Sequence, residues 1–142
     1  MWRIRLPSTQ LERPMIAHIS IGVRDIDRSK RFYDAVLEPL GYKCLRAAKS
    51  LVGYGYGRDS IAFWVFRAEH PVPAHDKSGL HLCFTAPDAA AVDAFHAAAI
   101  AAGGHDNGAP GLRPICGPDY YAAFIIDPDG YRIEACYGPA ES

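Results

Sequence analysis

Apolar and polar residues alternate in two stretches of the chain, residues 18–25 (HISIGVRD) and residues 81–88 (HLCFTAPD). Alternation of this kind predicts a β-strand with one buried and one open face. Each stretch ends on an aspartate, Asp25 or Asp88, and is followed by an amphipathic run that predicts a helix. Aspartate is a favoured N-cap because its carboxylate accepts the free amides of the first helical turn. The chain is therefore predicted to contain the same strand–helix unit twice.

Short runs with strand character follow each predicted helix. The clear ones lie at residues 43–48, 51–56, 61–66, 120–126 and 132–137. A weaker signal lies within residues 105–116, and Asp-Pro-Asp-Gly at residues 127–130 is typical of a tight hairpin turn. The pattern predicts an α+β fold of two βαβββ modules, whose partly polar open faces enclose a shared cavity.

Polar and proline-bearing residues separate the two predicted modules at residues 69–79 (EHPVPAHDKSG), which indicates a linker. We expect a single domain over residues 15–138, with modules at residues 15–68 and 80–138. Residues 1–14 lack the apolar run of a secretory signal. They are expected to form an extension outside the domain.

Composition excludes several classes of function. The 142 residues carry 15 basic and 16 acidic side chains, whereas nucleic-acid-binding domains usually show a basic excess. No apolar run approaches the roughly 20 residues needed to cross a bilayer. The four cysteines form no C-x-x-C pair and, without an export signal, indicate reduced thiols in a cytoplasmic protein. The expected partner is a small molecule, not nucleic acid or a membrane.

Three candidate metal ligands share the predicted open faces. His18 and His81 begin the two equivalent strands, and alternation places Glu134 of the last strand on the same side. Two imidazoles and a carboxylate predict a divalent metal site for zinc, iron, manganese or nickel. Three protein ligands leave positions open for substrate, and Glu134 is also a catalytic candidate. Alternatively, duplication alone retained the histidines, and Glu134 pairs with Arg132 or Arg113.

The segment 103–119 (GGHDNGAPGLRPICGPD) is rich in glycine and proline, as binding loops often are. Arg113 is a candidate for binding an anionic group of a substrate through two parallel hydrogen bonds. Asn107 is a candidate for binding polar groups, although Asn107-Gly108 is equally typical of a simple turn.

Aromatic residues supply the remaining candidates. Tyr120 and Tyr121 are consecutive in a predicted strand, so one of them should face the cavity. We assign Tyr121 as a catalytic proton donor and Tyr120 as a substrate contact, with core packing as the alternative for either. Trp64 belongs to an aromatic cluster, half of which should line the open face and favour a flat or hydrophobic ligand.

The sequence resembles the glyoxalase/bleomycin resistance/extradiol dioxygenase family, also called the vicinal oxygen chelate superfamily. Three motifs carry the resemblance: HISIGVRDIDRSKRFYDAVLEPLGY, HLCFTAPDAAAVDAF and FIIDPDGYRIEAC. The resemblance implies paired βαβββ modules that curl into half-barrels around a metal or ligand. Carried over to this chain, the family's metal ligands fall on His18, His81 and Glu134.

One departure from the family matters for the reaction. Glyoxalase I enzymes use a further glutamate ligand on the last strand of the first module, where this chain has Phe63 or Trp64. Methylglyoxal chemistry is therefore disfavoured. A lyase, isomerase or dioxygenase reaction on a small oxygen-rich substrate is expected instead. The alternative is a non-catalytic drug- or metabolite-binding protein of the bleomycin resistance type. Relatives of this fold usually pair, so a homodimer is expected.

Overall fold

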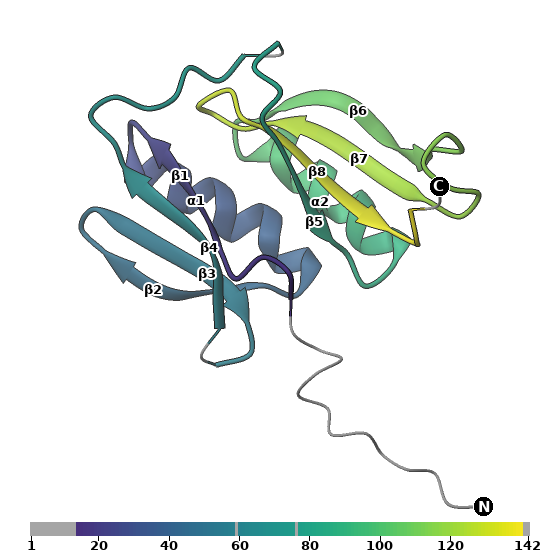
Figure 1. The fold of residues 1–142 in the computed structure, drawn as a ribbon, viewed down its shortest axis with the longest axis horizontal. Helices are drawn as coiled ribbons and strands as arrows, with labels where there is room; N and C mark the ends of the chain where they lie inside the picture. The colour runs from purple at the N-terminus through teal and green to yellow at the C-terminus, as the bar shows by residue number, and fades with distance from the viewer. Residues whose placement is uncertain (1–13, 59, 76, 141–142) are drawn as a thin grey trace, which may run out of the picture.

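The computed structural model describes residues 14–58, 60–75 and 77–140 and folds them into two four-stranded sheets with two α-helices (Figure 1). The first module contains β1 (Ile19–Val23), α1 (Ile26–Leu37), the short 3₁₀ helix η1 (Glu38–Leu40), β2 (Lys43–Ala48), β3 (Leu51–Tyr56) and β4 (Ser60–Arg67). The second contains β5 (His81–Thr85), α2 (Ala89–Ala101), β6 (His105–Leu112), β7 (Tyr121–Ile126) and β8 (Arg132–Tyr137). The predicted α+β fold of two βαβββ modules is confirmed. Most of the predicted extension, residues 1–13, lies outside the described residues.

Both modules have the same strand order, β1-β4-β3-β2 in one sheet and β5-β8-β7-β6 in the other. The first strand of each module runs parallel to the last, and the remaining neighbours are antiparallel. Ser20 of β1 lies opposite Trp64 of β4, and Cys83 of β5 lies opposite Glu134 of β8. These pairings fix which side chains of the first and last strands are neighbours on each open face.

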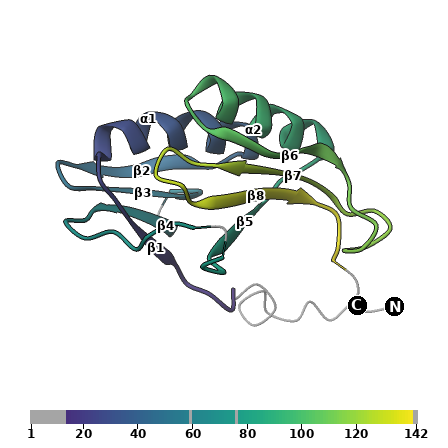
Figure 2. The same cartoon turned by 90° about the horizontal axis from the view of Figure 1, so that it is seen from above.

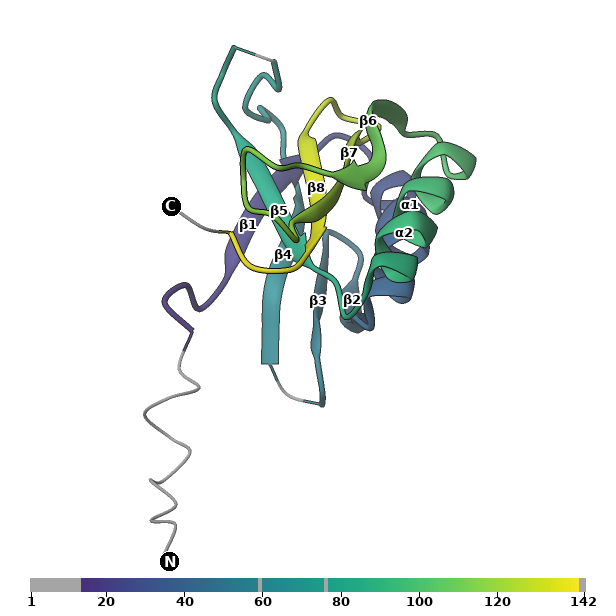
Figure 3. The ribbon, with the colours of Figure 1, turned by 90° about the vertical axis from the view of Figure 1, so that its right-hand side faces the viewer.

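The two helices lie together on one side of the sheets, and the opposite side is left open (Figures 2 and 3). Ile21 and Val23 of β1 are buried in the core, whereas Ser20, which points to the other face of the strand, is exposed. In β5 the odd-numbered residues are likewise exposed. The predicted alternation of both first strands is therefore confirmed.

Both helices begin as their capping residues predict. The Asp25 carboxylate accepts the backbone amide of Arg28 at 3.0 Å, and the Asp88 carboxylate accepts that of Ala91 at 2.8 Å. After α1 and η1 the chain turns at Gly41, whose φ of 88° is a left-handed conformation that glycine adopts without steric cost. In the described part of the chain, no helix combines the length and apolar character needed to cross a membrane.

A buried aspartate ties the modules together. Asp127, in the turn between β7 and β8, accepts the hydroxyl of Tyr33 on α1 at 2.6 Å. Its other oxygen accepts the backbone amides of Asp129 and Tyr131 at 2.9 and 2.8 Å. Burial raises the pKa of Asp127 to about 6. The hairpin turn predicted from Asp-Pro-Asp-Gly thus also anchors the second module to the first helix.

Candidate functional site

The open face of β5 and β8 gathers imidazole, thiol and carboxylate groups from two adjacent parallel strands. His81 and Cys83 come from β5, and Glu134 and Cys136 come from β8. Ile133 and Ala135, on either side of Glu134 in β8, are fully buried in the core, which fixes the strand's orientation. Strand alternation and parallel pairing therefore bring these four side chains to one side of the sheet.

Glu134 is the most enclosed of these groups, with only 8% of its side chain exposed. One carboxylate oxygen lies 2.7 Å from His81 Nε2. The other accepts a 2.6 Å hydrogen bond from the hydroxyl of Tyr120. Because a buried carboxylate is costly without partners, these two hydrogen bonds explain how Glu134 is tolerated there.

Tyr120 acts as a hydrogen-bond donor in this site. Burial raises the pKa of Tyr120, and hydrogen bonds with Cys136 and Glu134 raise it further. The phenol therefore stays protonated over the physiological range. Its hydroxyl also lies 3.9 Å from the sulfur of Cys83, so it reaches both strands of the site.

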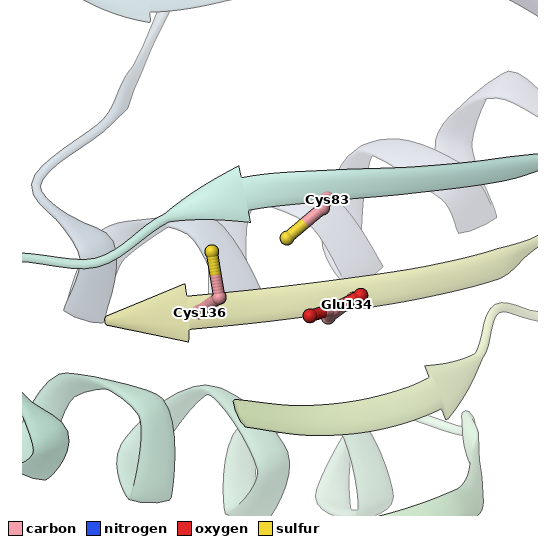
Figure 4. Close-up of side chains that lie close together, drawn as sticks. All are labelled: Cys83, Glu134 and Cys136. Atoms are coloured by element: carbon pink, nitrogen blue, oxygen red, sulfur yellow. The ribbon is translucent and has the colours of Figure 1, made fainter. Parts of the chain in front are cut away.

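The two thiols lie beside the carboxylate (Figure 4). The sulfurs of Cys83 and Cys136 and a Glu134 oxygen all lie within 4.8 Å of one another. The close approach of the two thiols lowers the pKa of Cys136, while the same approach and burial raise the pKa of Cys83. Among the described residues, this is the one group of three or more such side chains close enough to hold a metal ion.

His18 lies apart from this group. It is exposed and directly precedes β1, in the other sheet. The structure therefore brings together two of the three ligands implied by the resemblance, His81 and Glu134. Among the described residues of one protomer, His18 forms no group of ligand atoms within 4.8 Å with His81 and Glu134.

Trp64 holds the position in the first module that Glu134 holds in the second. Trp64 on β4 lies opposite Ser20, two residues after His18. Glu134 on β8 lies opposite Cys83, two residues after His81. Phe63, by contrast, is buried among core aromatics. The open-face position where a glyoxalase I glutamate is expected thus carries an indole.

The two candidates from the glycine-rich segment have different surroundings. Arg113 donates to the backbone carbonyls of Ala109 and Leu112 at 2.6 and 3.3 Å, and its guanidinium lies 5.3 Å from the centre of the Phe124 ring. Asn107 is exposed on β6. Arg113 is therefore held against its own loop, and an anion-binding role for it stays a prediction.

The consecutive tyrosines point to different partners. Tyr120 binds Glu134, whereas the Tyr121 hydroxyl donates to Asp93 on α2 at 2.6 Å. Tyr120, which is assigned from the sequence as a substrate contact, therefore lies at the Glu134 carboxylate. Tyr121, which is assigned from the sequence as a proton donor, lies against α2. The catalytic role of Tyr121 stays a prediction, and Tyr120 is the better placed of the two.

An aromatic pocket of about 250 Å³ lies beside the site and is lined by both modules. Its lining includes Tyr42, Tyr54, Phe63 and Phe84, together with Cys83 and Thr85 of β5. Cys83 belongs to both the pocket and the group around Glu134. A ligand could therefore place an apolar body in the pocket and its polar end near the carboxylate.

The donor atoms suit a transition-metal or zinc ion. An imidazole nitrogen and a buried carboxylate are common zinc ligands, and thiols add preference for soft cations. The hydrogen bond from Tyr120 to Glu134 also resembles the outer-shell contacts that orient metal ligands. The site therefore fits a divalent cation, with His81 and Glu134 as the adjacent pair of ligands.

The sequence patterns predict only that the four cysteines are reduced thiols, and they give Cys83 and Cys136 no functional role. A usable signal was nevertheless present. Cys83 has the same strand parity as His81, and Cys136 has the same parity as Glu134. What alternation could not supply is the parallel register that places these two thiols next to one carboxylate.

Comparison with known proteins identifies the fold and family. The sequence profile of the Glyoxalase/Bleomycin resistance protein/Dioxygenase superfamily matches residues 15–135. The crystal structure of a glyoxalase/bleomycin resistance protein from Albidiferax ferrireducens is 38% identical, covers 89% of this chain and all of that chain, and superposes with a TM-score of 0.74.

Two further relatives agree with this assignment. The uncharacterized protein YqjT of Bacillus subtilis is 31% identical over 123 residues, which is 82% of this chain and 94% of that protein. The structure of a lactoylglutathione lyase from Agrobacterium tumefaciens is 25% identical, with a TM-score of 0.60 over 89% of this chain and 96% of that one. With the repeated βαβββ topology and the profile match, these similarities show that the chain belongs to the Glyoxalase/Bleomycin resistance protein/Dioxygenase superfamily.

Proposed function

We propose that this protein is a divalent-metal-dependent enzyme that acts on a small oxygen-bearing substrate by a lyase, isomerase or dioxygenase reaction. The observation that carries the proposal is the buried carboxylate of Glu134, which contacts both an imidazole and a phenol on an open face. A carboxylate enclosed in this way beside a ligand-sized pocket supports a binding or reactive centre, because such sites combine an apolar pocket with a few convergent polar groups.

His18, His81 and Glu134 would hold the cation, which could be zinc, iron, manganese or nickel. When bound, the cation supplies a Lewis acid that stabilises negative charge on substrate oxygens. Because one protomer does not group His18 with the other two residues, we place the third ligand in a second copy of the chain. The proposal therefore includes a homodimer. We also place the protein in the cytoplasm, where its four free thiols stay reduced.

The chain's own residues bind and orient the substrate. The Tyr120 hydroxyl oxygen lies 2.6 Å from a Glu134 oxygen, and the hydroxyl can donate a hydrogen bond to a substrate oxygen that lies beside this carboxylate. The aromatic pocket excludes water from the apolar part of the substrate. Trp64 lies on the open face of the first module, and Arg113 and Asn107 are proposed to contact polar groups of the same molecule.

A second candidate function is binding without chemistry, as in a bleomycin resistance protein. The observation that favours it is Trp64 at the position equivalent to Glu134, which gives the first module an aromatic open face instead of a second carboxylate. On this alternative, the aromatic pocket binds a flat ligand and Glu134 is a satisfied polar residue.

Metal analysis of protein purified without chelator separates the two. The enzyme proposal expects about one divalent ion per chain, and Glu134→Gln should weaken metal binding by at least about tenfold because a charged ligand is lost. Glu69→Gln is the matched control, since Glu69 is exposed and outside the site. Wild-type protein that stays metal-free in excess Mn²⁺, Fe²⁺, Ni²⁺ and Zn²⁺ would leave the binding function as the better account.

A further inference from the structure

Cys83 and Cys136 form a pair that the proposed reaction does not use. They lie on neighbouring strands, and their sulfurs and a Glu134 oxygen are within 4.8 Å of one another (Figure 4). Cys83 is exposed and Cys136 is half-buried, so a small ion can reach both from solvent. The chain's other two cysteines, Cys44 and Cys116, lie outside this group.

We propose that Cys83, Cys136 and Glu134 form a second, thiolate-type site for a soft divalent cation such as Zn²⁺, complete within one protomer. It shares only Glu134 with the proposed catalytic set and needs neither His18 nor a second copy of the chain. The inference rests on the proposed function only in that both use this carboxylate. It extends that function because occupancy of the thiolate site would withdraw Glu134 from the other set.

The distances are suited to this chemistry. Zinc–sulfur bonds of about 2.3 Å in a tetrahedral site separate ligand atoms by roughly 3.5–4 Å, so groups within 4.8 Å need only small side-chain adjustments. Both thiols release their protons to solvent on binding, and each sulfur then donates a lone pair to the metal. Water fills the fourth position.

The surroundings of the group support a metal site. Ligating carboxylates are normally held by hydrogen bonds from neighbouring residues. Glu134 already has two such contacts, with His81 Nε2 at 2.7 Å and with the Tyr120 hydroxyl at 2.6 Å. The Tyr120 hydroxyl also reaches the Cys83 sulfur at 3.9 Å. The carboxylate is thus positioned before any ion binds.

A disulfide is the competing use of two neighbouring thiols. It requires direct sulfur–sulfur bonding and a narrow range of Cα separations. In the parallel register, Cys83 lies opposite Glu134, and Cys136 lies opposite Thr85, so the cysteines are diagonal rather than direct neighbours. A metal ion bridges such a diagonal without moving the strands, and for that reason we favour the metal.

Cobalt is the probe, because thiolate ligands give Co²⁺ an intense charge-transfer absorption in the near ultraviolet that nitrogen and oxygen ligands do not give. We expect the reduced wild-type protein to show this band on titration with Co²⁺ and to lose it when Zn²⁺ is added. Cys83→Ser and Cys136→Ser should each weaken Co²⁺ binding in this site by at least about tenfold. Cys44→Ser should leave the band unchanged.

The His18→Ala variant separates this inference from the proposed function. It should keep the thiolate band in full, while loss of Mn²⁺ binding in the same variant reports on the other ligand set. A variant that keeps the band but still binds Mn²⁺ would contradict the His18 site alone. Cobalt binding to wild-type protein without a thiolate band would overturn the thiolate site alone.

Alkylation of the wild-type protein tests the same point without any substitution. Zn²⁺ should slow the reaction of iodoacetamide with Cys83 and Cys136 by at least about tenfold, because metal-bound thiolates are less available as nucleophiles. Peptide mass spectrometry assigns the modified residues, with Cys44 and Cys116 as internal controls. Equal alkylation rates with and without Zn²⁺, or a Cys83–Cys136 disulfide that forms in air despite Zn²⁺, would overturn the proposal.

Discussion

The two modules share one backbone plan but carry different chemistry on their open faces. His18 and His81 precede or begin equivalent strands, yet the residues that follow diverge. Trp64 and Phe66 of β4 take the register positions that Glu134 and Cys136 take in β8. The repeated unit therefore fixes where side chains point, and individual substitutions decide which chemical groups each open face carries.

The divergence also gives the two faces different chemical groups. The second module holds the acidic and thiol groups together with their hydrogen-bond partner Tyr120. The first module contributes aromatic surface to the shared pocket. On the proposed function, a catalytic centre thus needs only one histidine from the first module, and it takes the rest from the second.

The largest expected effect tests whether that histidine comes from another copy. His18→Ala and Glu134→Gln proteins should each lose Mn²⁺ binding because each lacks one ligand of the proposed site. The thiols of Cys83 and Cys136 cannot replace it, since thiolates are poor ligands for Mn²⁺. Unfolding and refolding the two together forms mixed dimers with one intact site, which should restore roughly a quarter of the wild-type sites. Electron paramagnetic resonance of bound Mn²⁺ measures the recovery.

Two controls accompany this mixing experiment. Each variant refolded alone should stay without bound Mn²⁺, and sedimentation should give about twice the chain mass of 15.5 kDa. Absence of recovery in a sample that is shown to be dimeric would contradict a site shared between copies.

An effect of intermediate size concerns Asp127, whose contact with Tyr33 joins the two modules. Because burial raises the pKa of Asp127 to about 6 from its ordinary 3.8, protonation of this carboxyl favours the folded state. Its contribution to stability is complete below about pH 4 and is lost as the pH rises through about 6. Asp127→Asn should remove this dependence, which is on the order of 3 kcal/mol in the free energy of unfolding.

Urea unfolding of both proteins between pH 4 and pH 7 measures the Asp127 effect. The free energy of unfolding of the wild type should fall relative to that of Asp127→Asn as the pH rises. Parallel pH profiles for the two proteins would contradict a pKa of Asp127 that is raised by folding.

The smallest effect concerns Arg113 of the second module. Arg113→Ala removes two hydrogen bonds to loop carbonyls and the stacking on Phe124, so we expect a loss of about 1 kcal/mol in unfolding free energy. Arg58→Ala, a substitution at an exposed turn between β3 and β4, is the control. No loss relative to that control would show that the guanidinium is free of its loop and available to an anionic ligand.

Local patterns were enough to predict most of the fold. The strands at residues 43–48, 51–56 and 132–137 have the bounds expected from alternation and turn residues. Both aspartate caps also form as expected. These features depend on interactions between near neighbours in the chain, which a sequence displays directly. β6 was only a weak signal because its glycines coincide with shifts in register against β7.

The candidate site was predictable only in part, because its contacts are made between strands distant in the sequence. Alternation correctly put Glu134 opposite the buried face of β8. It could not decide between Tyr120 and Tyr121, since that depends on where β7 begins, and β7 begins at Tyr121. The closeness of Cys83, Cys136 and Glu134 depends on the register of β5 against β8, which no local pattern encodes.

The pocket between the modules is not closed by strand pairing. In the described part of the chain, the two sheets share no strand pairing, and the modules meet through α1 and α2 and through side-chain contacts such as Tyr33 with Asp127 and Phe63 with Phe84. The width of the pocket can therefore change over evolution through substitutions at a helix–helix contact, without remaking any sheet. Such a helix contact lets one scaffold accommodate ligands of different sizes while the β5–β8 strand pair, which we propose binds a metal, is inherited intact.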